Sequence, residues 1–289
     1  MDVFLRFNSY QAERLACLDV CAGAAFALAR LLLCFPGDRP LLNAGVVLAP
    51  LAVALWGLIS PRSYTRLRAL PAMLCRAAAV WSPSRRGILR PLRVGVLPEW
   101  DGSPGPPAAL RLLLWSSGIL PILAASLAYP LPLCLMLPLQ FGLVGGLWGR
   151  AADICGAAAA AEPALQRWAA AAARAVHPLS WVLLVPHPAV PLPADPCTAL
   201  VHWLQLLLAG ALPAFLVAAL ECKRFQFWSA AVVASSYLPP SCVHRFYAAL
   251  EASVDACLTG WRGTVILMDC AAACWLAACI AQWPGLRGG

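Results

Sequence analysis

Charged side chains are scarce in this sequence. Only 12% of its 289 residues are Asp, Glu, Lys or Arg, and Lys223 is the single lysine. Hydrophobic residues make up 62% of the chain, and the mean hydropathy is +0.75, whereas a soluble domain is about 45–50% apolar and about 25% charged. A globular interior of this size cannot hold so much apolar surface. The composition therefore excludes an ordinary soluble fold and indicates that lipid surrounds much of the chain.

Motifs that carry chemistry are missing as well. The sequence contains no G-x-S-x-G, no H-x-x-x-H, no phosphate-binding loop and no paired acidic motif, and it contains no recognisable nucleic-acid-binding module. Its four histidines do not cluster: His177, His187, His202 and His244. We therefore predict no catalytic residues, no metal, no cofactor and no nucleic-acid partner, and we favour a protein without catalytic activity over an enzyme.

No C-x-x-C pair occurs among the 13 cysteines, although Cys17 and Cys21, and likewise Cys270 and Cys274, are four residues apart. Thiols at this spacing share one face of a helix and could together hold a soft metal ion. Cysteine also packs in helices as a small apolar residue, and this is the interpretation that we favour. The odd number of cysteines leaves their redox state undecided.

Long apolar runs are what the sequence has in abundance. A membrane-spanning helix needs about 20 mostly apolar residues. The sequence therefore predicts an all-α integral membrane protein, a polytopic helical bundle of six or seven transmembrane helices that forms a single domain over residues 1–289. The six predicted spans are residues 15–35, 41–60, 109–128, 131–149, 199–220 and 264–283. Residues 225–240 are short for a span and form the possible seventh.

Arginines predict the orientation of these spans. Residues 62–93 contain eight arginines and no acidic residue, and short Arg-rich loops stay on the cytoplasmic side. We therefore place the N-terminus and the loop 61–108 on the cytoplasmic side, or on the equivalent side of an organelle. The segment Arg150–His177 is predicted to return to this side. Lys223 and Arg224 then fall on the opposite side, against the rule.

The basic loop 61–108 also predicts an interfacial amphipathic helix. Leu67, Leu70, Leu74, Ala78 and Trp81 recur at helical spacing and form one apolar stripe between arginines, as in a helix that lies among lipid headgroups. The arginines are expected to contact anionic lipid, or else to act only as a topology signal. They are Arg62, Arg66, Arg68, Arg76, Arg85, Arg86, Arg90 and Arg93.

Three charged residues lie inside apolar runs: Asp19, Arg30 and Asp269. Charged groups near the end of a span can reach its own interface, and we expect this of all three. The alternative is that they face the bundle interior and line a polar path. Asp19 and Asp269 would then form a pair of carboxylates at one depth in the membrane.

Gly142, Gly145, Gly146 and Gly149 form two overlapping G-x-x-x-G pairs in one predicted span. Glycine at this spacing lets two helix backbones approach closely. We predict a helix-packing face, either within the chain or between subunits.

These features favour a multi-pass membrane scaffold or assembly partner, whose partners are the lipid bilayer and other membrane proteins or a second copy of the chain. The first alternative is a transporter or channel for a small solute or ion that uses the intramembrane Asp and Arg residues. The second alternative is a membrane-embedded enzyme. The sequence does not indicate a substrate, an organelle or an oligomeric state.

Overall fold

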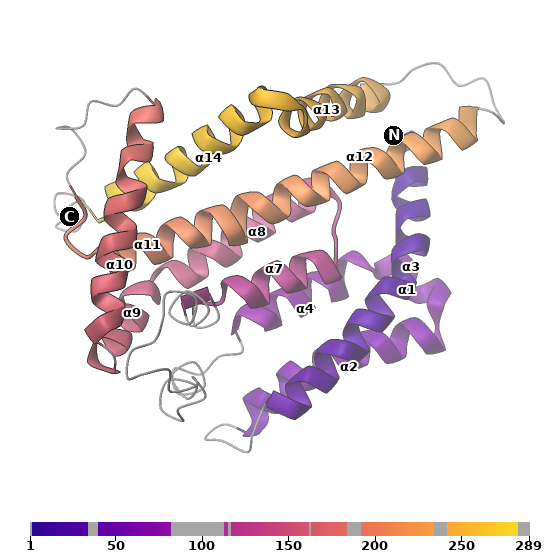
Figure 1. The fold of residues 1–289 in the computed structure, drawn as a ribbon. Helices are drawn as coiled ribbons and strands as arrows, with labels where there is room; N and C mark the ends of the chain where they lie inside the picture. The colour runs from indigo at the N-terminus through magenta and orange to yellow at the C-terminus, as the bar shows by residue number, and fades with distance from the viewer. Residues whose placement is uncertain are drawn as a thin grey trace, which may run out of the picture. The chain divides into compact units, whose positions relative to one another are not determined.

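The computed structural model describes residues 2–33, 40–81, 113–114, 117–161, 163–183, 192–233 and 242–282 (Figure 1). The elements in this part of the chain are all helices, with no strand among them, so the all-α prediction is confirmed. Where the sequence predicted one domain, the chain divides into two compact units. Unit 1 comprises Met1–Ser82, Ile122–Leu139 and Pro213–Asp255, and unit 2 comprises Pro83–Pro121, Gln140–Leu212 and Ala256–Gly289.

Unit 1 contains the N-terminal helices and the helices within residues Pro213–Asp255. Its elements are α1 (Asp2–Leu33), α2 (Pro40–Ile59), α3 (Pro61–Leu67), α4 (Ala69–Trp81), most of α7 (Ile119–Ala128), the first part of α8 (Leu133–Trp148), α12 (Leu212–Val233) and most of α13 (Cys242–Leu258). Its main core joins residues from five of these helices and from the turn before α8. The buried side chains are Val53, Tyr64, Ala72, Cys75, Tyr129, Leu131, Met136 and Val217.

Unit 2 contains the remaining elements. They are the end of α8, α9 (Ala151–Ala161), α10 (Pro163–Val176), the 3-10 helix η1 (His177–Leu183), α11 (Pro196–Leu204), the π-helix η3 (Gln205–Ala211) and α14 (Gly260–Ile280). Small residues on α10 and α11 pack with Trp275 of α14 in one buried cluster of this unit.

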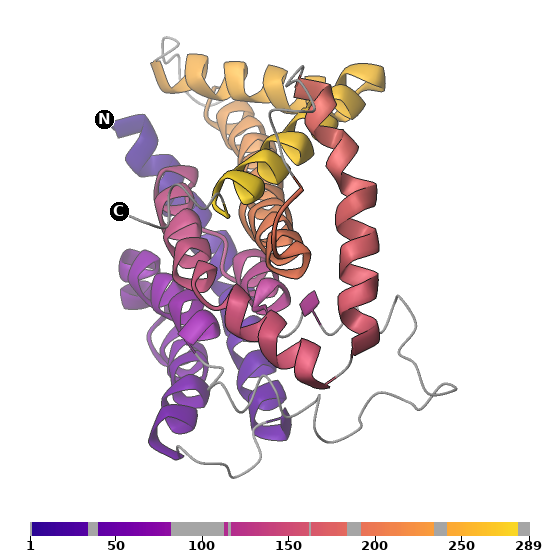
Figure 2. The same ribbon diagram turned by 90° about the vertical axis from the view of Figure 1, so that its left-hand side faces the viewer.

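Helices α1 and α2 lie side by side (Figures 1 and 2). Glycine allows their close approach, because a Cβ atom at Gly23 of α1 would lie 2.6 Å from the carbonyl oxygen of Pro50 in α2. Gly57 of α2 makes a similar close approach to α1, because a Cβ at Gly57 would lie 2.5 Å from Cγ2 of Val20. The backbone contact at Gly23 therefore fixes the distance between the two helices.

The fifth predicted span is part of a longer helix. Asp195 caps its N-terminus, Pro196 occupies the first turn, and α11, η3 and α12 continue one another through Val233. Residues Pro196–Val232 form 37 residues of continuous helix, about 56 Å at 1.5 Å per residue. The helix therefore extends beyond the predicted span 199–220, and the described part of residues 225–240 continues this same helix.

The other predicted spans agree with helices to different degrees. α2, α8 and α14 lie close to the predicted ranges 41–60, 131–149 and 264–283, whereas α1 begins thirteen residues before the predicted start at 15. The predicted span 109–128 is interrupted at Gly118, which has a φ of 77°, and α7 begins only after it. Two helices of the described chain, Pro196–Val232 and Gly260–Ile280, are long and apolar enough to cross a membrane.

The two faces of the α3–α4 segment are inverted relative to a soluble protein. Leu67, Leu70 and Leu74 of the predicted apolar stripe are each more than half exposed, whereas Arg68 and Arg76 are 5% and 1% exposed. Water-soluble helices place their large apolar side chains inside and their charges outside. The segment 61–81 is helical as predicted, but two of its arginines face the protein interior.

We predict that Gly23→Leu weakens the packing of α1 on α2. The added side chain would meet the backbone of α2, and overpacking of this kind typically costs about 1–3 kcal/mol of folding free energy. Thermal unfolding of the full chain in detergent micelles, followed by circular dichroism, should show a lower midpoint. The control is Ala24→Leu at the neighbouring exposed position, where an equal loss would contradict the close-packing explanation.

Candidate functional site

A buried ion pair links α1 to the α3–α4 segment in unit 1. Arg68 donates from Nε to Oδ2 of Asp19 at 2.6 Å and from Nη2 to Oδ1 at 2.9 Å. The hydroxyl of Tyr64 donates to Oδ2 of the same carboxylate at 2.7 Å. The Asp19 side chain is completely buried, so the expectation that it reaches the interface is wrong.

The local sequence places both donors on one face. Tyr64 and Arg68 are four residues apart in continuous helical conformation, so their side chains lie one above the other. Two charges out of water are costly unless geometry and hydrogen bonding are good, and the planar guanidinium here matches both oxygens of the carboxylate. Burial, the hydrogen bond to Asp19 and the Asp19 charge raise the pKa of Tyr64 above its usual value of 10, so the phenol remains a donor at neutral pH.

A second buried arginine links α4 to α7. Arg76 donates from Nη2 to Oγ of Ser126 at 2.7 Å, and the same hydroxyl donates to the carbonyl oxygen of Ile122 at 2.7 Å. Burial lowers the pKa of Arg76 to about 10, which still leaves the guanidinium protonated at neutral pH. Two of the eight predicted lipid-contacting arginines therefore bind protein groups inside unit 1.

Sequence reasoning missed a third charged link, at Glu221 of α12. Its Oε2 accepts a hydrogen bond from the backbone N–H of Leu133 at 2.9 Å, and its Oε1 accepts one from the Tyr247 hydroxyl. Leu133 is the first residue of α8, where a negative charge is favourable because the helix dipole is positive there. The sequence feature that could have indicated this link is the position of Glu221, an acidic residue directly after the predicted apolar run 199–220.

Aromatic rings pack beside Glu221 and hold the start of α1. Phe7 lies edge-on to Phe225 and Tyr247, with ring centroids 5.0 and 5.4 Å apart, while Phe225 stacks on Tyr247 at 4.1 Å. Trp228 completes this cluster. Aromatic pairs at these separations contribute about 0.5–1.5 kcal/mol each beyond their burial, so α1 is held well before its predicted start.

Polar side chains gather around the π-helix in unit 2. Gln205 donates from Nε2 to the carbonyl oxygen of Ser117 at 3.3 Å, and Gln140 donates to that of Ala209. The ring of His202 stacks on Trp148 at 4.0 Å, and its Nε2 lies 3.1 Å from the Trp148 carbonyl oxygen. π-Helical turns frequently occur at functional sites, and this one sits beside the helix break at Ser117–Gly118.

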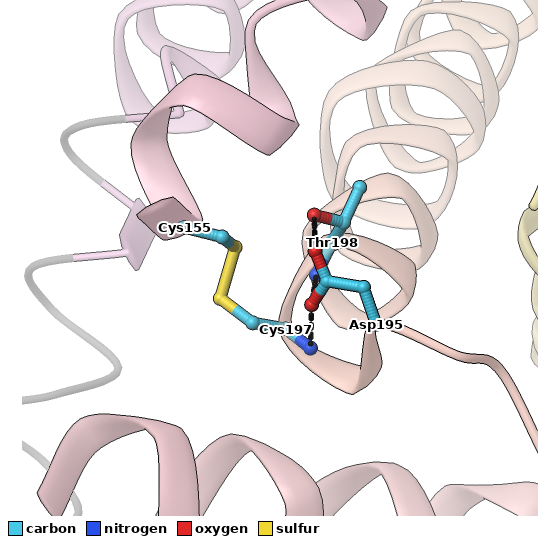
Figure 3. Close-up of a disulfide and its surroundings, with 4 residues drawn as sticks. All are labelled: Cys155, Asp195, Cys197 and Thr198. Atoms are coloured by element: carbon cyan, nitrogen blue, oxygen red, sulfur yellow. Dashed lines mark hydrogen bonds between the residues drawn. A yellow bond between two sulfur atoms is a disulfide. The ribbon is translucent and has the colours of Figure 1, made fainter. Parts of the chain in front are cut away.

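A disulfide joins Cys155 of α9 to Cys197 in the first turn of α11 (Figure 3). Asp195 caps this turn, because its Oδ1 accepts from the backbone N–H groups of Cys197 and Thr198 at 3.1 and 3.2 Å. Both cysteines are buried. The interpretation of all cysteines as small apolar residues is therefore wrong for this pair, which is separated by 42 residues and follows no recognisable spacing.

The remaining predicted site residues are not gathered in one place. Arg62 and Arg66 are exposed, and Asp269 is half-buried on α14. Asp19 belongs to unit 1 and Asp269 to unit 2. Arg30 lies within α1, but its side chain falls outside the described residues, as do Arg85, Arg86, Arg90 and Arg93.

The glycine face of α8 is open. Gly142, Gly145 and Gly146 of α8 and Gly149 directly after it are exposed, and a Cβ atom added at any of them would meet no described atom within 4 Å. Of the two predicted alternatives, packing within the chain therefore finds no support in the part of the chain that the structure describes.

The buried polar groups mainly connect helices. Asp19, Arg76 and Glu221 each bond to a residue on another helix or at its end, and no group of three or more His, Cys, Asp or Glu side chains among the described residues could hold a metal ion. Such bonds are strong because the interior screens them little. The arrangement is therefore suited to fixing helix positions.

We predict that Arg68→Gln destabilises unit 1 severely. The substitution leaves the Asp19 carboxylate buried without its cation, which typically costs about 3–5 kcal/mol. Adding Asp19→Asn should recover part of this loss, because the remaining pair is neutral. Unfolding of the full chain in detergent measures both effects. Arg66→Gln, at an exposed position two residues away, is the control and should change stability by no more than about 0.5 kcal/mol.

We also predict that stability falls at alkaline pH through Tyr64. Its pKa is raised in the folded chain, so below about pH 10 the phenol is neutral in both states and its contribution is complete. Above that value the unfolded phenol ionises while the folded one resists, and stability decreases by up to about 1.4 kcal/mol per pH unit. Unfolding of Tyr64→Phe between pH 9 and 11.5 should show a shallower decrease than the wild type, and identical slopes would contradict this assignment.

Comparison with known proteins leaves these sites without a template. No protein-family model matches the chain, and searches of curated proteins and of solved structures find no significant match either.

Proposed function

We propose that this chain is a multi-pass membrane scaffold that holds other apolar helices against its surface. The observation that carries the proposal is the open glycine face of α8, in a chain whose buried Asp19 and Glu221 are already bonded to other protein groups. A scaffold needs a stable interior and a surface that accepts a partner. The bonded Asp19 and Glu221 side chains stabilise the interior, and the glycine face of α8 provides the surface.

The outward leucines of the α3–α4 segment support embedding in a membrane. Leu67, Leu70 and Leu74 are exposed while Arg68 and Arg76 are buried, and this inversion is favourable only where the surroundings are apolar. The two candidate spans, Pro196–Val232 and Gly260–Ile280, point the same way. In this proposal the N-terminus and loop 61–108 are cytoplasmic, and exposed Arg62 and Arg66 contact anionic lipid.

The α8 face supports helix–helix assembly. In a membrane there is little hydrophobic drive for two helices to associate, so close backbone packing over small residues supplies much of the attraction. Gly142 and Gly146 are one helical turn apart and present bare backbone. The partner is an apolar helix with small residues of its own, from a second copy of the chain or from another membrane protein.

Transport is the second candidate, and one region favours it. The helix break at Gly118 lies in the same unit as the π-helix, and Ser117 Oγ and Gln205 Oε1 are buried without a hydrogen-bond partner among the described residues. Broken helices with exposed backbone groups are typical of binding sites in secondary transporters. Against transport, the Asp19 carboxylate is occupied by Arg68 and Tyr64.

The proposed scaffold is tested by blocking the glycine face. Gly142→Leu with Gly146→Leu adds bulk where a partner helix must approach, and should convert the complex formed by the wild-type chain in mild detergent to a smaller species on native electrophoresis. The matched control is Gly156→Leu, an equally exposed glycine of α9 with no atom within 4 Å of its Cβ position. A wild-type chain that runs as a monomer, or a control that dissociates equally, would contradict the proposal.

A further inference from the structure

The Cys155–Cys197 disulfide bears on which cellular compartment the start of α11 faces. Disulfides form and persist in oxidising surroundings such as the endoplasmic reticulum lumen, the periplasm or the cell surface, and cytosolic reductants keep thiols reduced. Cys197 lies in the first turn of α11, beside the Asp195 cap. A disulfide at the N-terminal end of the 37-residue helix is therefore evidence for oxidising surroundings at that end.

The same helix carries cations further along. Lys223 is exposed and Arg224 is half-buried in α12, and the stretch from Cys197 to Leu220 contains no Asp, Glu, Lys or Arg. At 1.5 Å per residue the helix rises about 39 Å between Cys197 and Lys223, which exceeds the roughly 30 Å hydrocarbon core of a bilayer. One apolar helix thus separates a disulfide from a pair of cations.

We propose that Cys155 and Cys197 are a modification site on the extracytoplasmic face, oxidised there by a thiol–disulfide oxidoreductase, and that α11–α12 runs from that face to the cytoplasm. The disulfide then ties α9 to the outer end of this helix, and Lys223 with Arg224 lies at its inner end, as the positive-inside rule requires. The proposal needs the helix to cross a membrane, but it does not depend on the scaffold role or on the α8 face.

The oxidation is an exchange between two dithiol–disulfide pairs. One cysteine thiolate attacks the disulfide of the oxidoreductase and forms a mixed disulfide, which the second thiolate resolves. The S–S bond of the enzyme breaks, a bond forms between the two Sγ atoms of the chain, and the enzyme leaves as a dithiol with the two protons and two electrons. The reaction occurs on the extracytoplasmic side only, because that compartment is oxidising and the cytosol is reducing. It requires no unusual reactivity of these two cysteines.

This orientation removes the conflict that the sequence left at Lys223 and Arg224. Arg68 and Arg224 both belong to unit 1, and the proposal places Lys223 and Arg224 on the same cytoplasmic side as the loop 61–108. The segment Arg150–His177 moves to the opposite side. Its charges favoured the cytoplasm only weakly, because three arginines are opposed by Asp153 and Glu162.

The pairing is tested on the full chain in its native membranes. Free thiols are blocked with N-ethylmaleimide, disulfides are then reduced, and the released thiols are labelled with polyethylene glycol maleimide. The wild type should gain two labels, and Cys155→Ser or Cys197→Ser should gain none. Cys242→Ser, which removes an exposed free cysteine of α13, is the control and should still gain two. No label on the wild type, or loss of label in the control, would overturn the proposal.

The orientation is tested with a maleimide that cannot cross membranes. Ala194→Cys introduces a thiol at an exposed residue beside the Asp195 cap, and the natural Cys242 reports on the region after α12. In sealed membrane vesicles, the label gained by Ala194→Cys and the label lost by Cys242→Ser should come from opposite sides. Labelling of both positions from one side would overturn the proposal, even if the glycine-face experiment had supported the scaffold.

Discussion

The Asp19–Arg68 ion pair is the constraint on which unit 1 depends. A carboxylate that is completely buried on α1 requires a cation, and Arg68 provides one with both of its facing nitrogens. An arginine drawn inward at this point turns the whole α3–α4 segment, because its leucines must then occupy the opposite face. The pair thus decides which residues of the segment meet the protein and which meet its surroundings.

The same principle recurs elsewhere in unit 1. Arg76 reaches Ser126 on α7, and Glu221 receives the first backbone N–H of α8. Each link places a polar group inside and leaves apolar side chains outside, as expected where the medium is less polar than the protein interior. The proposed scaffold role would rely on these internal polar bonds to hold unit 1 together.

The extent of the helices was partly predictable. Hydropathy identified α2, α8 and α14 closely, because each coincides with an apolar run of the right length. At the start of α1 and the end of α12, where apolar and polar residues are mixed, the helices extend beyond the predicted spans. Those turns are helical because Phe7 and Phe225 pack in one aromatic cluster, and tertiary packing of this kind overrides local composition. The interruption at Gly118 was missed as well, because hydropathy is averaged over a long window and the short Ser116–Ser117–Gly118 stretch lies inside an otherwise apolar run.

The sequence by itself determined that this chain is helical and far too apolar for an ordinary soluble interior, since those properties are sums over composition and periodicity. Only the tertiary structure decided that Asp19 meets Arg68, 49 residues away, and that Cys155 bonds Cys197 across 42 residues. Such pairings depend on which faces of two helices come together. Hydropathy records how apolar each helix is, and it contains no information about which residue another helix brings to its face.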